Sequence, residues 1–182
     1  MKKTALSLLF FCILKVGHSQ IFIGNDCTVS FFSATSMENI DAVNKISKPV
    51  LNSETGEVLF RIQNTAFKFK SQLMEEHFNE NYMESEKYPT STFKGKVNEK
   101  IDFTINGENK VTVSGKLTMH GVDKDVTIEG IITIKDGQVT LHSKFPIKLD
   151  DYKIKVPSLV GVNIAESIDV TVDAVLIPYK KK

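Results

Sequence analysis

The 182-residue sequence predicts an all-β domain interrupted by one short helix. Over most of the chain, apolar and polar residues alternate, which is the period of a strand that buries one face. Turn signals such as Asn106-Gly107 and Asp136-Gly137 separate the alternating stretches, so we expect antiparallel neighbours joined by short turns. The only clear helical pattern lies within residues 66–97, and we expect it to close one end of the β structure.

Residues 1–19 have the features of a secretory signal peptide. Two lysines precede an apolar run at 5–14, and the small residues Gly17 and Ser19 suit a cleavage site at the end of this leader. The run is too short for a permanent membrane span, which needs ~20 apolar residues. We therefore expect an exported protein, periplasmic or extracellular, in which residues 20–182 form one domain with no permanent membrane span.

Charge and cysteine content argue against several kinds of partner. The chain has 23 basic and 22 acidic residues, and the leader carries three of the basic ones and none of the acidic ones, so the mature domain has a net charge of −2. A nucleic-acid-binding protein normally presents a basic face, so we expect no nucleic-acid partner. Cys27 is the single cysteine of the mature domain; it cannot form an internal disulfide, and we expect it to pack as a small apolar residue.

The first part of the domain predicts short strands that lead to the helix. Apolar residues begin a strand at 29–32 and a weaker one at 40–43. A turn at 53–56 precedes a strand at 58–62, in which every second residue is apolar. Two phenylalanines alternate again at 67–69, directly before the helix.

Residues 73–78 predict a short amphipathic helix. Its apolar-side residues fall at i, i+1, i+4 and i+5 and gather on one side: Leu73, Met74, His77 and Phe78. Tyr88-Pro89 should stop any helix and begin an extended segment that continues to Val97. This places the helix where a lid on the β structure would lie.

After Pro89 the alternation becomes more regular. We expect strands at 101–105, 111–119, 126–134, 139–147 and 168–176, each with one apolar face. Antiparallel strands of this kind must bury their apolar faces together.

Closing the sheet on itself buries those faces and also removes exposed strand edges. Gly115 is where we expect a bulge or a sharp bend, as a barrel requires. About eight strands enclose an interior that is either filled by side chains or large enough for one ligand. A β-sandwich with a solid core would show the same alternation, so periodicity alone leaves both architectures open.

Three segments resemble the YceI-like family of secreted lipid-binding proteins. They are HFNENYMESEKYP at 77–89, LTMHGVDKDV at 117–126 and, with a weaker match, FPIKLDDYKIKVP at 145–157. The resemblance extends over most of the mature chain. It implies a closed antiparallel, lipocalin-like β-barrel that encloses the apolar chain of an isoprenoid or fatty ligand, and it brings no catalytic motif.

The inward phase of the strands and the apolar side of the helix give the predicted ligand-binding residues. These are Phe60, Ile62, Phe67, Leu73, His77, Phe78, Tyr82, Phe103, Val113, Leu117, Phe145 and Val172. Because a closed apolar barrel offers no place for a polar head group, we expect such a group to lie at the mouth. The segment from Leu73 to Tyr88 would supply the polar contacts, from His77, Asn79, Asn81, Tyr82 and Tyr88.

Catalytic and metal chemistry find little support in the sequence. His77 follows two glutamates, but the spacing is not HExxH and both carboxylates cannot share its face of the helix. The chain has no GxSxG motif and no Gly-rich phosphate loop. We expect no enzyme, no metal site and no cofactor other than a bound lipid or isoprenoid.

Two functions fit these observations. The first is an exported carrier or sequestering protein for a long-chain apolar small molecule. The second is a structural or interaction domain with a solid core, which would bind a protein partner through its outer surface. The state of the interior distinguishes them, because only the first requires a cavity.

Overall fold

The computed structural model describes residues 20–34, 39–155 and 166–180, and the predicted leader lies outside the described residues. The barrel strands are β1 (Ile21–Ser33), β3 (Val50–Asn52), β4 (Glu57–Gln63), β6 (Thr90–Val97), β7 (Gly107–Met119), β8 (Val122–Lys135), β9 (Gln138–Lys148) and β10 (Ser167–Pro178). Two short strands, β2 (Ile40–Asn44) and β5 (Lys68–Phe69), continue from β1 at one end.

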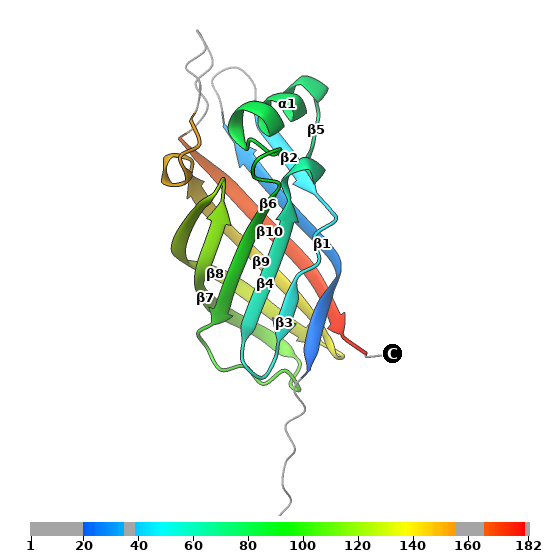
Figure 1. Cartoon of the computed structure of the whole chain (residues 1–182). Coiled ribbons are helices and arrows are strands. Elements are labelled where there is room, and N and C mark those ends of the chain that lie inside the picture. The colour runs from blue at the N-terminus through cyan, green and yellow to red at the C-terminus, as the bar shows by residue number, and fades with distance from the viewer. Residues whose placement is uncertain (1–19, 35–38, 156–165, 181–182) are drawn as a thin grey trace, which may run out of the picture.

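The helical elements are few and short. The helix α1 (Gln72–His77) continues into a π-helical turn, η2 (Phe78–Tyr82), at the same end as β2 and β5 (Figure 1). Two 3₁₀ turns, η1 (Asn64–Ala66) and η3 (Asp150–Tyr152), lie in connecting segments. The predicted helix is therefore present, and Tyr88-Pro89 separates it from β6 as expected.

The strands form a closed antiparallel barrel of eight strands in the order β10-β9-β8-β7-β6-β4-β3-β1, and β1 pairs with β10 to complete it. This pairing runs from Phe22 opposite Pro178 to Phe32 opposite Asp169, with a bulge between Gly24 and Asp26. The predicted fold class, including closure of the sheet, is confirmed.

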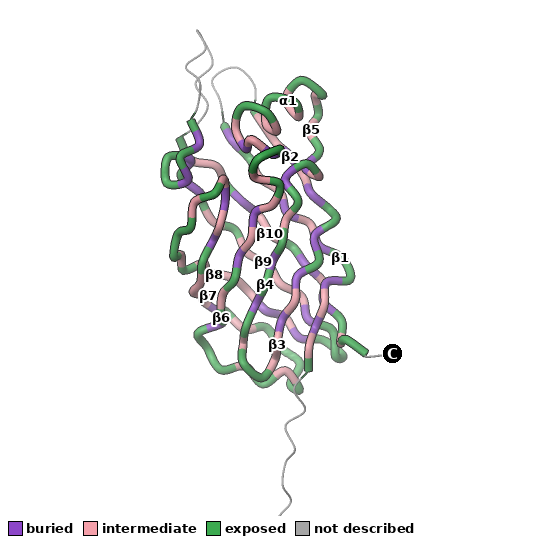
Figure 2. Tube along the Cα trace, viewed as in Figure 1, coloured by how far each residue is buried: buried purple, intermediate pink, exposed green. Residues whose placement is uncertain are grey.

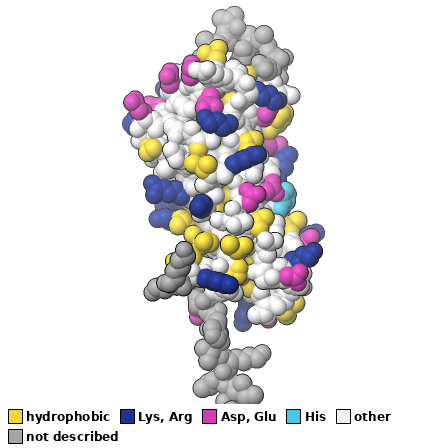
Figure 3. Space-filling view, turned by 90° about the vertical axis from the view of Figure 1, so that its right-hand side faces the viewer, with side chains coloured by type: hydrophobic (Ala, Val, Ile, Leu, Met, Phe, Trp, Pro, Cys, Tyr) yellow, Lys and Arg dark blue, Asp and Glu magenta, His cyan; other side chains and the backbone are white. Residues whose placement is uncertain are grey.

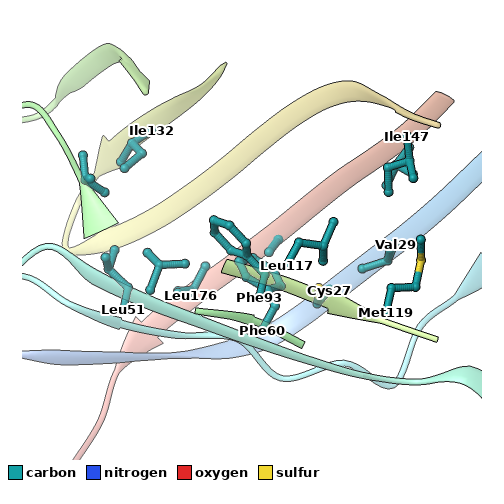
Figure 4. Close-up of a cluster of buried hydrophobic side chains, with 14 of the residues drawn as sticks. Cys27, Val29, Leu51, Phe60, Phe93, Leu117, Met119, Ile132, Ile147 and Leu176 are labelled. Carbon is teal, nitrogen blue, oxygen red and sulfur yellow. The ribbon is translucent and has the colours of Figure 1, made fainter. Parts of the chain in front are cut away.

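The alternation of apolar and polar residues in the sequence corresponds to an alternation of buried and exposed residues along the strands. On β10, Val170, Ala174 and Leu176 are buried while Asp169 and Asp173 are exposed. Figure 2 shows the same change from buried to exposed along the other strands. Inward side chains from adjacent strands pack together, as Phe60, Phe93 and Leu117 do across β4, β6 and β7 (Figure 4).

The outer surface also carries apolar residues. Ile23 pairs with Ile177 on β10 and with Val50 on β3, and Val50 pairs with Leu59 on β4. These four residues form one row across the outside of the barrel. Figure 3 shows hydrophobic side chains gathered in the lower half of one face, among charged groups.

Two sequence expectations are wrong in detail. Residues 101–105 form a turn rather than a strand: the Asp102 carboxylate accepts hydrogen bonds from the Thr104 backbone N–H (2.9 Å) and hydroxyl (2.6 Å), and local bonding of this kind competes with a ladder. No bulge occurs at Gly115, which pairs in register with Gly95. A Cβ on Gly115 would lie 2.3 Å from the Gly95 Cα, so glycine permits a close backbone approach there.

Two fully buried asparagines hold the helical segment to the barrel. Asn44, at the end of β2, donates from Nδ2 to the Gln63 carbonyl (2.9 Å) and accepts from the Ile46 backbone N–H (3.1 Å). Asn64 donates to the Tyr88 carbonyl (2.7 Å) and accepts from the Ser91 hydroxyl. The Asn44 bond joins β2 to β4, which no strand ladder connects, and the Asn64 bonds extend the contact between β4 and β6 beyond the end of their ladder.

Replacement of Asn44 by alanine should lower the free energy of unfolding by about 2 to 3 kcal/mol, because buried backbone groups would lose their partner. Urea denaturation measures this change. The matched control is Asn98→Ala, since Asn98 is exposed and its side chain bonds the Thr112 and Ser114 hydroxyls, whose loss should cost below about 1 kcal/mol. Equal losses in the two variants would contradict a structural role for Asn44.

Candidate ligand cavity

The barrel is not solid: it encloses a cavity of about 430 Å³. Inward side chains of the strands make most of its wall, including Val58, Phe60, Ile62, Phe93, Val111, Val113, Leu117, Leu141, Phe145, Ile147, Val170 and Val172. This volume is within the range of small-molecule sites, which are ~300–1,000 Å³ and mostly apolar. A long apolar chain matches such a lining, because its transfer from water into the cavity is favourable.

The structure brings most of the predicted ligand-binding residues to this cavity. Those that line it are Phe60, Ile62, Phe67, His77, Phe78, Tyr82, Val113, Leu117, Phe145 and Val172. Their contact with a ligand stays a prediction.

Leu73 and Phe103 lie away from the cavity. The Leu73 side chain is 58% exposed, because a residue turns by ~100° from its neighbour along a helix and the cavity side of α1 is taken by Met74, His77 and Phe78. Phe103, in the β6–β7 turn, packs on Phe22 with ring centroids 5.9 Å apart. Neither lines the cavity, so both were placed wrongly within the inward set.

Four phenylalanines close the end of the barrel beneath α1. Phe78 stacks on Phe31 of β1 with ring centroids 5.5 Å apart and an interplanar angle of 25°. Phe67 and Phe69 contact the same two rings at centroid distances from 5.0 to 5.8 Å. Such pairs stabilise beyond the area they bury, so this cluster anchors the helical segment on the barrel.

The polar groups near this end are neutral hydrogen-bonding groups. Tyr82 lines the cavity, and burial raises the pKa of its phenol. Ser33 also lines it; the residue is 2% exposed and its hydroxyl has no hydrogen-bond partner in the described part of the chain. Sequence reasoning missed Ser33 because a serine in the inward phase of a strand looks like a break in the pattern. Its hydroxyl can bond to a polar group of a ligand.

The loop after α1 contributes less than expected. Asn79 uses its Nδ2 to bond the Glu75 carbonyl (2.9 Å), Asn81 is exposed, and Tyr88 packs edge-on against His120 with ring centroids 4.7 Å apart. None of the three lines the cavity. Only His77 and Tyr82 of the predicted polar set do.

The YceI-like domain matches residues 14–176 of the chain. This protein belongs to the YceI-like family. The comparison with curated proteins found no significant match.

Solved structures share this YceI-like fold at low sequence identity. A polyisoprenoid binding domain from Saccharophagus degradans has a TM-score of 0.75 at 13% identity, with 88% of this chain and 99% of that chain covered. BcnA of Burkholderia cenocepacia has a TM-score of 0.69 at 18% identity, covering 82% and 95% of the two chains. A YceI protein of Campylobacter jejuni has a TM-score of 0.56 at 20% identity, covering 100% of both.

Two further titratable groups of this YceI-like barrel, Cys27 and His120, do not line the cavity. Cys27 is 1% exposed, and burial, with a contribution from Asp26 and Asp173, raises its pKa to about 11. His120, in the turn between β7 and β8, is half-buried: its Nε2 lies 2.7 Å from Glu84 Oε2 and its Nδ1 3.0 Å from the Tyr152 carbonyl oxygen. The imidazole therefore links the loop after η2 to η3.

Two absences concern the described residues alone. Within 20–34, 39–155 and 166–180, no three His, Cys, Asp or Glu side chains converge so that they could hold a metal ion. In the same part of the chain, no helix has both the length and the apolar character needed to cross a membrane.

Replacement of Leu117 by aspartate should abolish folding or ligand retention, because Leu117 is 7% exposed and an unpaired carboxylate would face the apolar interior. Thr171→Asp is the matched control, since Thr171 points outward between Asp169 and Asp173 and pairs with Lys144. We expect it to change stability by no more than about 0.5 kcal/mol. Thermal unfolding measures both, and equal tolerance at the two positions would overturn the assignment of faces.

Proposed function

We propose that this YceI-like protein binds a long-chain apolar molecule, such as an isoprenoid or a fatty chain, inside its barrel. The observation that carries the proposal is the apolar cavity of about 430 Å³ within a closed sheet. A domain that served only as a scaffold would gain stability by filling that space, since cavities in cores are destabilising. The polyisoprenoid binding domain of S. degradans has the same fold and supports this choice of ligand.

We also propose that the protein acts outside the cytoplasm as a carrier or sequestering protein, without catalysis. The features of residues 1–19 support export, because a charged start and a short apolar run precede small residues. A molecule with a long apolar chain is poorly soluble in water, and a barrel that encloses the chain would allow it to cross an aqueous compartment.

The polar end of the ligand is proposed to lie beneath α1. His77 and Tyr82 line the cavity there, and the Ser33 hydroxyl lies buried without a partner in the described structure. No lysine or arginine occurs among the described residues that line the cavity. A neutral head group such as a hydroxyl or carbonyl suits these contacts better than a phosphate, which proteins usually pair with cations.

Affinity should increase steeply with the length of the ligand chain until the cavity is filled. Each buried methylene contributes ~0.8 kcal/mol of transfer free energy, which corresponds to about a fourfold lower Kd. Isoprenols of increasing length, measured by displacement of the fluorescent fatty acid cis-parinaric acid, give this dependence. Salt should have little effect. Flat affinity across the series together with strong salt dependence would contradict binding in an apolar cavity.

Replacement of His77 and Tyr82 together by phenylalanine should weaken binding of a long isoprenol by about tenfold or more, since two neutral hydrogen bonds contribute ~1 kcal/mol each. The saturated hydrocarbon of the same skeleton is the control ligand, and its affinity should change much less. The melting temperature of the unliganded variant checks that the fold is intact. If the melting temperature and both affinities stay unchanged, the head group does not lie beneath α1.

A further inference from the structure

The barrel wall is incompletely bonded between β8 and β9. The strand β8 pairs with β7 along its length from Val122, and β9 pairs with β10 up to Lys148. The two strands pair with each other only from Lys135 opposite Gln138 to Ile131 opposite His142. Beyond that rung, no ladder joins them within the described residues, although both strands continue.

The residues at the end of the ladder explain why it stops. Gly130 weakens a strand, because it has no side chain to pack and loses the most conformational freedom on folding. Further along β9, four residues beyond the last rung, Pro146 lacks a backbone N–H and cannot complete a ladder to β8, which is why proline in sheets is restricted to edges and bulges. Gly130 and Pro146 therefore both disfavour continuation of the β8–β9 ladder.

The same place has the smallest inward side chains of either strand. Gly130 shares its phase with Ile128 and Ile132 on β8, and Ser143 shares its phase with Leu141 and Phe145 on β9. The Cβ position of Gly130 lies 3.5 Å from the Ser143 Cβ, so the two small residues are in contact where the ladder ends, and the unbonded part of the two strands begins beside them. The neighbouring inward positions carry bulky apolar side chains, whereas Gly130 and Ser143 leave a recess in the barrel wall. We call this recess the notch.

The cavity reaches this notch. Glu129, Ile131 and His142 belong to the outward phase of their strands, and Glu129 and His142 are exposed, yet all three border the cavity. Gly130 and Ser143 border it as well, so the cavity extends to the point where the β8–β9 ladder ends. The Ser143 hydroxyl donates a 2.6 Å hydrogen bond to the Glu129 carbonyl, and this bond is the one side-chain link across the gap that the structure describes.

The two ends of the barrel are less suited to the passage of a ligand. Away from α1, Phe22, Leu51 and Leu176 fill the interior and are 0–1% exposed. Beneath α1, His77 is exposed and borders the cavity, but the cluster of four phenylalanine rings would have to separate before a chain could pass. Between β8 and β9, the described residues beyond the ladder are joined by one side-chain hydrogen bond, from Ser143 to the Glu129 carbonyl, and by no aromatic cluster.

We propose that the gap beside Gly130 and Ser143 is the passage through which the apolar ligand enters and leaves the barrel. This inference rests on the proposed function, since it assigns a route to the same cavity. The strands on either side keep their ladders to β7 and β10, so the gap can widen without opening the barrel elsewhere.

A disulfide across the notch tests the passage. The double variant Gly130→Cys and Ser143→Cys, with Cys12 and Cys27 replaced by alanine, places the two Cβ atoms about as far apart as in a disulfide, for which ~3.5–4.5 Å is usual. Stopped-flow fluorescence with cis-parinaric acid gives the association and dissociation rate constants. We expect the oxidised form to lower both by about tenfold or more, and reduction to restore them.

The matched control is the pair Thr133→Cys and Thr140→Cys in the same background. Thr133 and Thr140 are directly paired in the bonded part of the same two strands, and neither borders the cavity. Its disulfide should leave both rate constants unchanged. Ser143→Leu is a second variant that needs no oxidation: it fills the notch and removes the bond to Glu129, and it should also slow uptake if the fold, checked by circular dichroism, is retained.

The outcomes separate the passage from the proposed function. Binding with unchanged rate constants in both the oxidised notch variant and folded Ser143→Leu would overturn the passage and leave the binding function standing. Absence of probe and isoprenol binding by the unaltered protein would overturn the proposed function itself. Equal slowing by the control disulfide would show that general stiffening of the sheet, and no local passage, governs the rates.

Discussion

The pairing of β1 with β10 is the interaction on which the rest of the structure depends. Without it, an eight-stranded sheet would have two unpaired edges and an apolar face with nothing to cover it. With it, the inward side chains of all strands share one interior. A cavity can persist there because the surrounding ladders stabilise the fold. The bulge at Gly24–Asp26 gives β1 the extra twist that closure requires.

The cavity has a cost that the two ends of the barrel offset. Atoms that face empty space lose the dispersion contacts of a packed core, so stability must come from regions that are filled. Phe22, Leu51 and Leu176 fill one end, and the phenylalanine cluster beneath α1 fills the other. Next to the helical segment, Asn44 and Asn64 bond the Gln63 and Tyr88 carbonyls. The solid parts thus lie above and below the space proposed for the ligand.

Much of the fold could be predicted from the sequence, because period-two alternation reports directly which face of a strand is buried, as on β10. The same rule failed at Phe103, where a carboxylate-capped turn produces apolar residues at every second position without a strand. The prediction for Leu73 was wrong because a two-turn helix has a narrow inner side. Which residues of such a helix face inward depends on the elements it packs against. Asn44 and Ser143 could not be found from apolar periodicity, since each bonds a residue distant in the chain, and Ser33 could not because a serine in the inward phase only interrupts the apolar pattern.

The divergence of β8 and β9 has a consequence for the behaviour of the protein in concentrated solution. Unbonded backbone along both strands is a template on which another chain could add a strand, the usual beginning of β aggregation. Four of the outward side chains beside that gap are charged: Asp125 and Glu129 on β8, Lys144 and Lys148 on β9, all exposed. Charges at such positions disfavour the approach of a second sheet edge. The barrel wall can therefore remain unbonded between β8 and β9 without promoting aggregation of the protein.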